Sequence, residues 1–403
     1  MPNMEQLIRE RILSKIDLSF DISDEEIKGL IRTEIIDKSK ETPMSLKERK
    51  IIENRIFNSL RKLDILEDLL SDESITEIMI NGPKDIFIEK DGRIIKSEET
   101  FSSEEKLDDI IQNIVAKNNK VVNESNPIVD TRLADGSRVN IVLRPAAVDH
   151  SILSIRKFPK EQMTMARLKE YGSIDDKQIE FLRMLVKSGY NIFISGGTGS
   201  GKTSFLNSLA EFIPSDERVI TIEDSAELQL KNVDNLVRLE ARSANLEGNN
   251  EITIRDLLKS SLRMRPDRIV VGECRGAEAL EMLQAFNTGH DGSFSTGHSN
   301  SCKDMLSRLE TMVLMGAEIP LAAIRQQIAS GIDIIVQLGR LRDKSRKVLE
   351  ISEIDGIENG EIRLNKLFVY KEEDEVEGRV VGSWEKVGQL KHTEKLLAKG
   401  YRP

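Results

Sequence analysis

The stretch Gly-Gly-Thr-Gly-Ser-Gly-Lys-Thr fills positions 196–203, between an apolar run at 191–195 and a helix-like apolar segment at 203–212. Its glycines allow backbone N–H groups to converge on phosphates, its lysine can bridge the β and γ oxygens, and its last hydroxyl can ligate Mg²⁺. A chance glycine-rich turn would rarely show the full pattern between a strand and a helix. The stretch therefore predicts a nucleotide-binding loop in an α/β fold.

The residues on both sides of this loop alternate between helix and strand patterns. We expect helices at 179–186, 203–212 and 254–264, and strands at 191–195, 218–222 and 268–271. This alternation predicts a parallel sheet with helical crossovers. Further helices and a meander of strands are expected at 304–314, 321–330, 332–338, 348–353 and 362–370. The loop-bearing domain is thus predicted to span 177–370, and a polar tail is predicted at 371–403.

The part of the chain before this domain has a different texture. Positions 1–70 contain apolar residues at three- and four-residue spacing among many charges, which predicts an N-terminal helical region. Short β-rich runs punctuated by turns follow at 71–158 and predict a separate α/β domain. The polar stretch 159–176 is predicted to be a linker.

Composition restricts the classes of function that remain. The 403 residues are 39% hydrophobic and 32% charged, which suits a folded chain with charged surface helices. A formal net charge of -10 gives no global attraction for a polyanion, so nucleic acid is not an expected partner. Two cysteines without paired spacing, and no apolar run near the roughly 20 residues that cross a bilayer, predict a cytoplasmic protein whose membrane association is peripheral.

Carboxylates end two of the expected strands. Glu273 follows the apolar run 269–271, at the sheet edge where ligands bind, and could orient or deprotonate a water molecule. Acidic residues after buried strands are common, so a structural role for Glu273 is equally open. Glu223 and Asp224 follow 218–222 and could hold Mg²⁺ through water, although Asp224 could instead cap a helix.

Two Thr-Gly-His triplets contain two of the four histidines, His290 and His298. Zinc binding is a possible interpretation, but the nearby Cys274 and Cys302 lack a paired ligand at zinc-site spacing. We therefore favour a phosphate-sensing role for the two histidines.

Arginines gather near the end of the predicted N-terminal α/β domain. Guanidinium groups suit phosphate oxygens and transition-state charge, although a solvated basic face is an equally open interpretation for any one of them. The arginines concerned are Arg132, Arg138, Arg144 and Arg156. A stronger functional case exists for Arg263, Arg265 and Arg275, which flank the strand before Glu273.

Four motifs together resemble those of the type II/type IV secretion ATPases. They are the loop at 196–203, Thr-Ile-Glu-Asp-Ser-Ala-Glu at 221–227, the run at 262–276 that includes Val-Val-Gly-Glu-Cys-Arg-Gly, and Asn-Thr-Gly-His-Asp-Gly-Ser at 287–293. The resemblance extends from about 75 to 370 and includes Ser-Ile-Arg-Lys-Phe at 154–158. It is closest to the CpaF/TadA branch, which powers assembly of tight-adherence (Flp) pili.

This resemblance implies a hexameric ring of subunits, each with an α/β, PAS-like N-terminal domain before a RecA-like motor domain, and with ATP and Mg²⁺ between the two domains. It implies that Glu223 belongs to an aspartate box, that Glu273 is the Walker B carboxylate, and that His290 and His298 form a histidine box. The implied catalytic residues are Glu273, Lys202, Glu223, His298 and Arg275. The implied nucleotide contacts are Gly197, Thr198, Gly199, Ser200, Gly201, Lys202, Thr203, Ser204, Arg132, Arg144, Arg156, Arg263 and His290, with Thr203 and Glu223 at the metal.

Two positions depart from related patterns. Gly272 stands where many phosphate-loop enzymes carry the aspartate that holds Mg²⁺, so we expect Glu223 to hold the metal through water. Gly297 stands where members of the wider superfamily often have a bulky apolar residue, which leaves the placement of His298 open.

The function that follows is an ATP-hydrolysing motor for protein secretion or for a type IV or Flp-like pilus, which it would assemble, or both assemble and retract. Its expected partners are copies of itself, a membrane platform protein at its cytoplasmic face and, indirectly, pilin. Two alternatives come from other classes. A RecA-like nucleic-acid translocase would show ATPase activity stimulated by single-stranded DNA. A nucleotide-gated scaffold would bind ATP without releasing phosphate.

Overall fold

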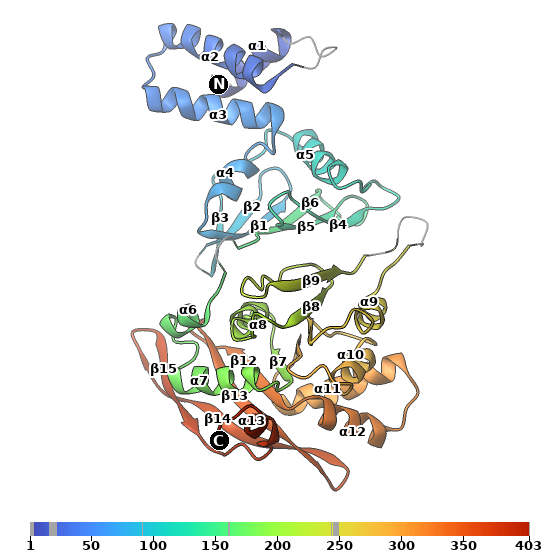
Figure 1. Cartoon of the computed structure of the whole chain (residues 1–403). Helices are drawn as coiled ribbons and strands as arrows, with labels where there is room; N and C mark the ends of the chain where they lie inside the picture. Colours follow the sequence, from blue (N-terminus) through green and yellow to red (C-terminus); the bar gives the residue numbers. More distant parts are fainter. Residues whose placement is uncertain are drawn as a thin grey trace. The chain divides into compact units, whose positions relative to one another are not determined.

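The computed structural model describes residues 4–15, 22–90, 92–159, 162–242, 244 and 250–402. The chain divides into two compact units, Met1–Pro159 and Lys160–Pro403, both drawn in Figure 1. Within the described ranges, no helix is both long and apolar enough to cross a bilayer.

The first unit begins with three helices, α1 (Met4–Lys15), α2 (Asp24–Glu41) and α3 (Leu46–Arg61). α2 and α3 each begin with a capping box, in which a serine and a glutamate three residues later satisfy the first backbone N–H groups. Isoleucines at helical spacing, including Ile12, Ile31 and Ile56, form a shared apolar core. The short helix α4 (Leu66–Ser71) leads into the sheet.

An antiparallel sheet of six strands completes the first unit, in the order β3-β2-β1-β6-β5-β4. Its strands are β1 (Ile75–Asn81), β2 (Ile86–Lys90), β3 (Arg93–Lys96), β4 (Ile128–Arg132), β5 (Arg138–Val142) and β6 (Ile152–Arg156). The amphipathic helix α5 (Glu104–Ala116) packs Leu107, Ile110 and Ile111 into the same core as strand residues such as Ile78 and Ile141. A turn at 133–137 joins β4 to β5.

The second unit contains a sheet of nine strands in the order β15-β14-β13-β12-β7-β11-β10-β8-β9. From β12 to β9 every pairing is parallel, as the helix–strand alternation predicts. These strands are β7 (Ile192–Gly196), β8 (Arg218–Glu223), β9 (Asn235–Glu240), β10 (Arg268–Val271), β11 (Phe294–Gly297) and β12 (Ile334–Arg340). The sequence predicts neither β9 nor β11, because β9 is a partly exposed edge strand and β11 is a four-residue strand that reads Phe-Ser-Thr-Gly.

Helices cover both faces of this sheet (Figure 1). α6 (Met165–Glu170), α7 (Asp176–Lys187) and α8 (Lys202–Ala210) share a core with Ile192 and Ile194 of β7. α9 (Ile254–Ser261), α10 (Ala279–Phe286), α11 (Cys302–Gly316) and α12 (Leu321–Gly331) share a second core with Phe193. Successive residues of β7 therefore face opposite layers, which explains why the strand is apolar throughout.

Two stretches differ from their predicted roles as a linker and a tail. The 159–176 stretch contains α6, whose Met165 and Leu168 are buried in the core; positions 160 and 161 lie outside the described residues. Residues after 370 continue β14 (Glu361–Val376), which pairs with β13 (Arg346–Glu358) and β15 (Arg379–Lys386), and helix α13 (Glu394–Ala398) buries Leu396. The polar sequence conceals these strands because most of their side chains face solvent.

Candidate active site

The phosphate loop lies between β7 and α8, at the edge where the parallel strands end. Gly201 precedes α8 with φ of +92°, a left-handed conformation that favours glycine. A Cβ at Gly196 would lie 2.5 Å from Oγ of Ser200 and 2.8 Å from the carbonyl oxygen of Leu338. The glycines therefore permit both the turn and the close packing that the loop requires.

Lys202 points back into the loop and is 8% exposed. Its Nζ donates to the carbonyl oxygens of Gly196 and Gly197, each at 3.1 Å, and lies 3.2 Å from Nδ1 of His298. An ammonium group has only donors, so Nδ1 of His298 accepts and the proton of the neutral ring sits on Nε2. Burial, together with the positive charges of Lys202 and Arg275, lowers the pKa of His298 despite the nearby Glu273.

Glu273 follows β10 and joins this cluster from the adjacent strand. His298 Nε2 lies 2.8 Å from its Oε1, and Arg275 donates to its Oε2 at 2.7 Å. The histidine contact does not have hydrogen-bond angles, so within the described residues this buried Oε1 has no hydrogen-bond donor. Burial alone would raise the pKa of Glu273, but Arg275, His298 and Lys202 outweigh it and lower that pKa. Glu273 is thus an ionised carboxylate that can accept a hydrogen bond from water.

Glu223 ends β8 and is 4% exposed. Its Oε2 accepts from the backbone N–H groups of Glu227 and Leu228 at 2.7 and 2.9 Å. Its buried Oε1 has no hydrogen-bond partner in the described part of the chain. A Cβ at Gly272 would lie 2.8 Å from Cγ of Glu223, so Glu223 occupies the space that a side chain at position 272 would need. This packing explains the glycine that departs from the usual pattern.

The donor set fits a magnesium ion that is held mainly by phosphates and water. No group of three or more His, Cys, Asp or Glu side chains that could hold a metal occurs among the described residues. Mg²⁺ usually keeps several waters and takes one or two carboxylates plus substrate phosphates. The Oε1 of Glu223, which has no partner among the described residues, could accept a hydrogen bond from such a water, and Thr203 is the second residue of α8, directly after the loop.

Burial raises the pKa of Glu223 to about 7, despite its two backbone hydrogen bonds. The folded protein therefore binds a proton that the unfolded chain releases near its ordinary value of 4.5. This contribution to stability is fully present below about pH 4.5 and is lost as pH rises through about 7. We expect the free energy of unfolding of wild type, relative to Glu223→Gln, to fall by up to about 3 kcal/mol across that window. Urea unfolding of both proteins at pH 5 and pH 8 measures this difference, and an equal pH dependence in both would contradict the assignment.

Arg275 contacts carboxylates that follow two neighbouring strands, β8 and β10. Besides bonding Glu273, it places Nη1 3.7 Å from a carboxylate oxygen of Asp224. No helix begins directly after Asp224, in the described stretch 225–242, so the alternative of a helix cap is wrong; this residue forms an ion pair across neighbouring strand ends.

His290 and Arg263 lie away from the phosphate loop of their own unit, and their contact with nucleotide stays a prediction. His290 precedes β11, with Nδ1 3.0 Å from the carbonyl oxygen of Ala285, whereas His298 follows β11. Arg263 similarly precedes β10. In a parallel sheet the starts and ends of strands lie at opposite edges, so the length of the strand separates both residues from Lys202.

Three of the four arginines singled out in the first unit lie in a row across neighbouring strands, and the fourth lies apart from them. Strand register places Arg132 opposite Arg138, and Arg138 opposite Arg156, whose Nε lies 3.9 Å from Glu77. Arg144 follows the other end of β5 and pairs with Glu104 at 3.4 Å. The contact of Arg132, Arg144 and Arg156 with nucleotide stays a prediction.

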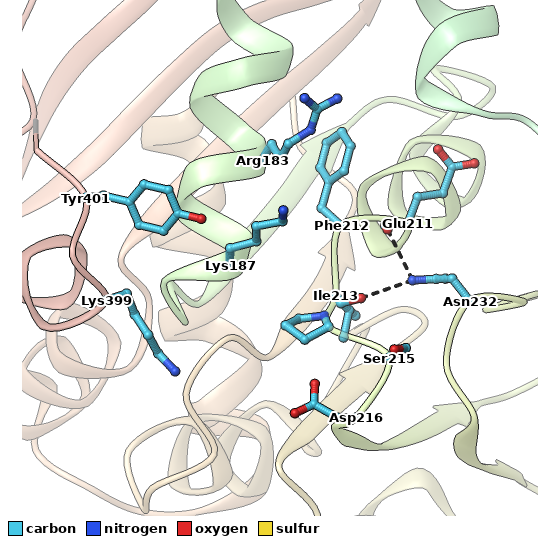
Figure 2. A pocket seen from close by; sticks show the side chains of 11 residues that line it. Arg183, Lys187, Glu211, Phe212, Ile213, Ser215, Asp216, Asn232, Lys399 and Tyr401 are labelled. Atoms are coloured by element: carbon cyan, nitrogen blue, oxygen red, sulfur yellow. Dashed lines mark hydrogen bonds between the residues drawn. The ribbon is translucent and has the colours of Figure 1, made fainter.

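A hollow of about 810 Å³ lies elsewhere in the second unit, between the end of α7, the turn after α8 and the C-terminal residues Lys399 and Tyr401 (Figure 2). Asn232 fixes its wall by donating to the carbonyl oxygens of Glu211 and Ile213, each at 3.1 Å. The hollow adjoins the residues just before β8, whereas the loop follows the end of β7. It is therefore separate from the candidate site.

Comparisons with known proteins found a family model and relatives that match most of this chain. The family model described as "Type II/IV secretion system protein" matches residues 59–382. A putative conjugal transfer protein of Mycobacterium tuberculosis is 33% identical over 294 residues, which cover 72% of this chain and 83% of that protein. The type IV secretion system protein VirB11 of Bartonella henselae is 31% identical, over 72% of this chain and 92% of its own.

Among solved structures, the ATPase DotB of Legionella pneumophila has a similar fold. Its TM-score is 0.52 at 24% identity, with 72% of this chain and 79% of that chain covered.

Proposed function

This chain belongs to the type II/IV secretion system protein family, and from that premise we propose that it is an ATP-hydrolysing motor subunit. The observation that carries the proposal is the continuous set of contacts from Lys202 through His298 to Glu273 and Arg275. It joins the end of the phosphate loop to a carboxylate that has an oxygen available for water.

The contacts in this cluster support a distinct role in hydrolysis for each of its residues. Lys202 would exchange the carbonyl oxygens of Gly196 and Gly197 for phosphate oxygens when ATP binds. Glu273, ionised and half-buried, would orient the attacking water through Oε1. His298 contacts both Lys202 and Glu273. Binding of ATP at the loop would therefore influence the carboxylate that orients the water. Arg275 would hold Glu273 in place. Mg²⁺ would supply charge neutralisation at the phosphates, held by Thr203 directly and by Glu223 through water.

We further propose a ring of six copies in which Arg132, Arg144 and Arg156 bring positive charge toward the nucleotide. The row formed by Arg132, Arg138 and Arg156 supports this role, since guanidinium groups suit phosphate oxygens. The motor would act on a membrane platform protein from the cytoplasmic side, and pilin would be moved indirectly. The tight-adherence pilus branch is proposed from the motifs quoted above, and the names of the relatives support secretion or transfer more broadly.

Ring formation tests the motor proposal directly. We expect electron microscopy of the full chain with Mg²⁺ and a non-hydrolysable ATP analogue to show closed rings of six subunits. Lys202→Ala, which removes the phosphate-binding ammonium, should form fewer rings under the same conditions. Finding only monomers of the wild-type chain at high concentration with nucleotide would contradict the proposal.

A further inference from the structure

Two arginines that the motifs do not include reach the phosphate loop from the hairpin between β12 and β13. β12 runs parallel to β7, and Leu338 pairs with Gly196 at the start of the loop. The next turn of chain therefore lies at the same sheet edge as the loop. Arg340 ends β12 and Arg346 begins β13, and the two residues are direct partners across the hairpin.

Both side chains extend over the glycines of the loop. Arg346 donates from Nε to the carbonyl oxygen of Gly199 at 2.9 Å. Its Cδ would be 3.3 Å from a Cβ placed at Gly201, and Nη1 of Arg340 would be 3.9 Å from a Cβ placed at Gly199. The two guanidinium groups thus sit at the backbone that is expected to surround the phosphates.

Neither guanidinium is neutralised by a carboxylate among the residues that the structure describes. Arg340 and Arg346 are both exposed. Like charges directly opposite each other on neighbouring antiparallel strands are destabilising. The neighbouring Arg342 provides the contrast, because it forms ion pairs with Glu372 and Glu375 of β14. Asp343 in the same turn accepts from the backbone N–H of Val380 at 2.9 Å, which ties the hairpin to β15. An anchored hairpin that holds two uncompensated cations against a phosphate loop is suited to an anion.

We propose that Arg340 and Arg346 bind phosphate oxygens of the nucleotide held by the loop of the same subunit, and that Arg346 also positions the loop through Gly199. The inference rests on the proposed function, since it deepens the same nucleotide site. It assigns a phosphate contact to the hairpin between β12 and β13, within the same unit as the loop.

Binding of ADP with Mg²⁺ to the full chain, measured by calorimetry, tests this assignment. We expect Arg340→Gln and Arg346→Gln each to raise the Kd for ADP about 10-fold, the loss of one charge-assisted hydrogen bond. Arg346→Lys keeps the charge but lacks the Nε–H group, so it should recover only part of the affinity. Lys344→Asn is the matched control, because it removes a charge from the same hairpin and asparagine tolerates the left-handed backbone at this position, where φ is +68°.

Thermal unfolding distinguishes phosphate binding by Arg340 and Arg346 from a purely structural role of these residues. Without nucleotide, Arg340→Gln should leave the unfolding midpoint unchanged or raise it, because a repulsion between like charges is relieved. With ADP, its midpoint should rise less than that of wild type. An ADP Kd within twofold of wild type in both glutamine variants would overturn the inference, whether or not their midpoints fall. Lys202→Ala keeps the two proposals apart, since normal ADP binding by that variant would instead overturn the proposed nucleotide site itself.

Discussion

Glu273→Gln is expected to lower the steady-state rate of ATP hydrolysis by about 100- to 1,000-fold, within the range that general-base and water-orienting groups contribute. Glutamine can still accept the hydrogen bond that Arg275 donates, so the local structure should persist. It lacks the negative charge that holds the attacking water and that opposes the positive charges of Lys202 and Arg275. Phosphate release measured at saturating ATP reports the effect, and calorimetry should show that ADP still binds.

Glu278, which lies in the same segment between β10 and α10 as Glu273, provides the control for this substitution. Glu278 accepts from the backbone N–H groups of Arg275 and Gly276 at 2.6 and 2.9 Å, bonds that a glutamine can retain. Glu278→Gln should therefore leave the rate within about threefold of wild type, as expected for a substitution with little energetic effect. If Glu273→Gln hydrolysed ATP at the wild-type rate in a folded ring, the role assigned to this carboxylate would be wrong.

Lys395→Met is expected to reduce the free energy of unfolding by about 2–3 kcal/mol, at or below the lower end of the roughly 3–5 kcal/mol that breaking a fully buried ion pair costs. Lys395 Nζ contacts Asp333 at 2.8 Å, Asp291 at 2.9 Å and the carbonyl oxygen of Gly189 at 3.1 Å. These contacts tie α13 to residues just before β7, β11 and β12. Its removal leaves Asp333 desolvated without a cation, but 30% of Lys395 and 23% of Asp333 remain exposed, so solvent limits the loss.

Urea unfolding followed by circular dichroism measures this loss, with Lys399→Met as the control. Lys399 lies four residues farther along the same segment, at the rim of the hollow in Figure 2, and is exposed. Its replacement should change the free energy of unfolding by less than about 0.5 kcal/mol. Equal effects of the two substitutions would show that the ion pair at Asp333 does not anchor the C-terminal helix.

Sequence reasoning worked best where the chemistry is contiguous along the chain. The loop at 196–203 contains its own glycines, lysine and hydroxyl, and the flanking apolar patterns were sufficient to predict a strand, a helix and a parallel sheet. It failed where polar residues alternate on an exposed strand. The chain after 370 looked like a tail because β14 and β15 bury few side chains, whereas their backbone hydrogen bonds hold them in the sheet.

The two Thr-Gly-His triplets show the limit most clearly. They are identical in sequence and eight positions apart, but β11 lies between them. A strand of four residues spans about 13 Å, so one histidine reaches Lys202 and the other lies at the far edge of the sheet. No local pattern distinguishes the two residues, because the difference arises from where the strand begins and ends.

The sequence by itself determined that this chain has a loop with the phosphate-binding pattern within a parallel α/β sheet, since the groups expected to contact phosphate are adjacent in the chain. Only the tertiary structure decided which residues lie beside that loop. It brings His298, Glu273 and Arg275 to Lys202, fills the space beside Gly272 with Glu223, and places Arg340 and Arg346 over the loop glycines. The physical reason is that strand order and register, set by packing between distant segments, decide which strand ends meet at one edge of the sheet.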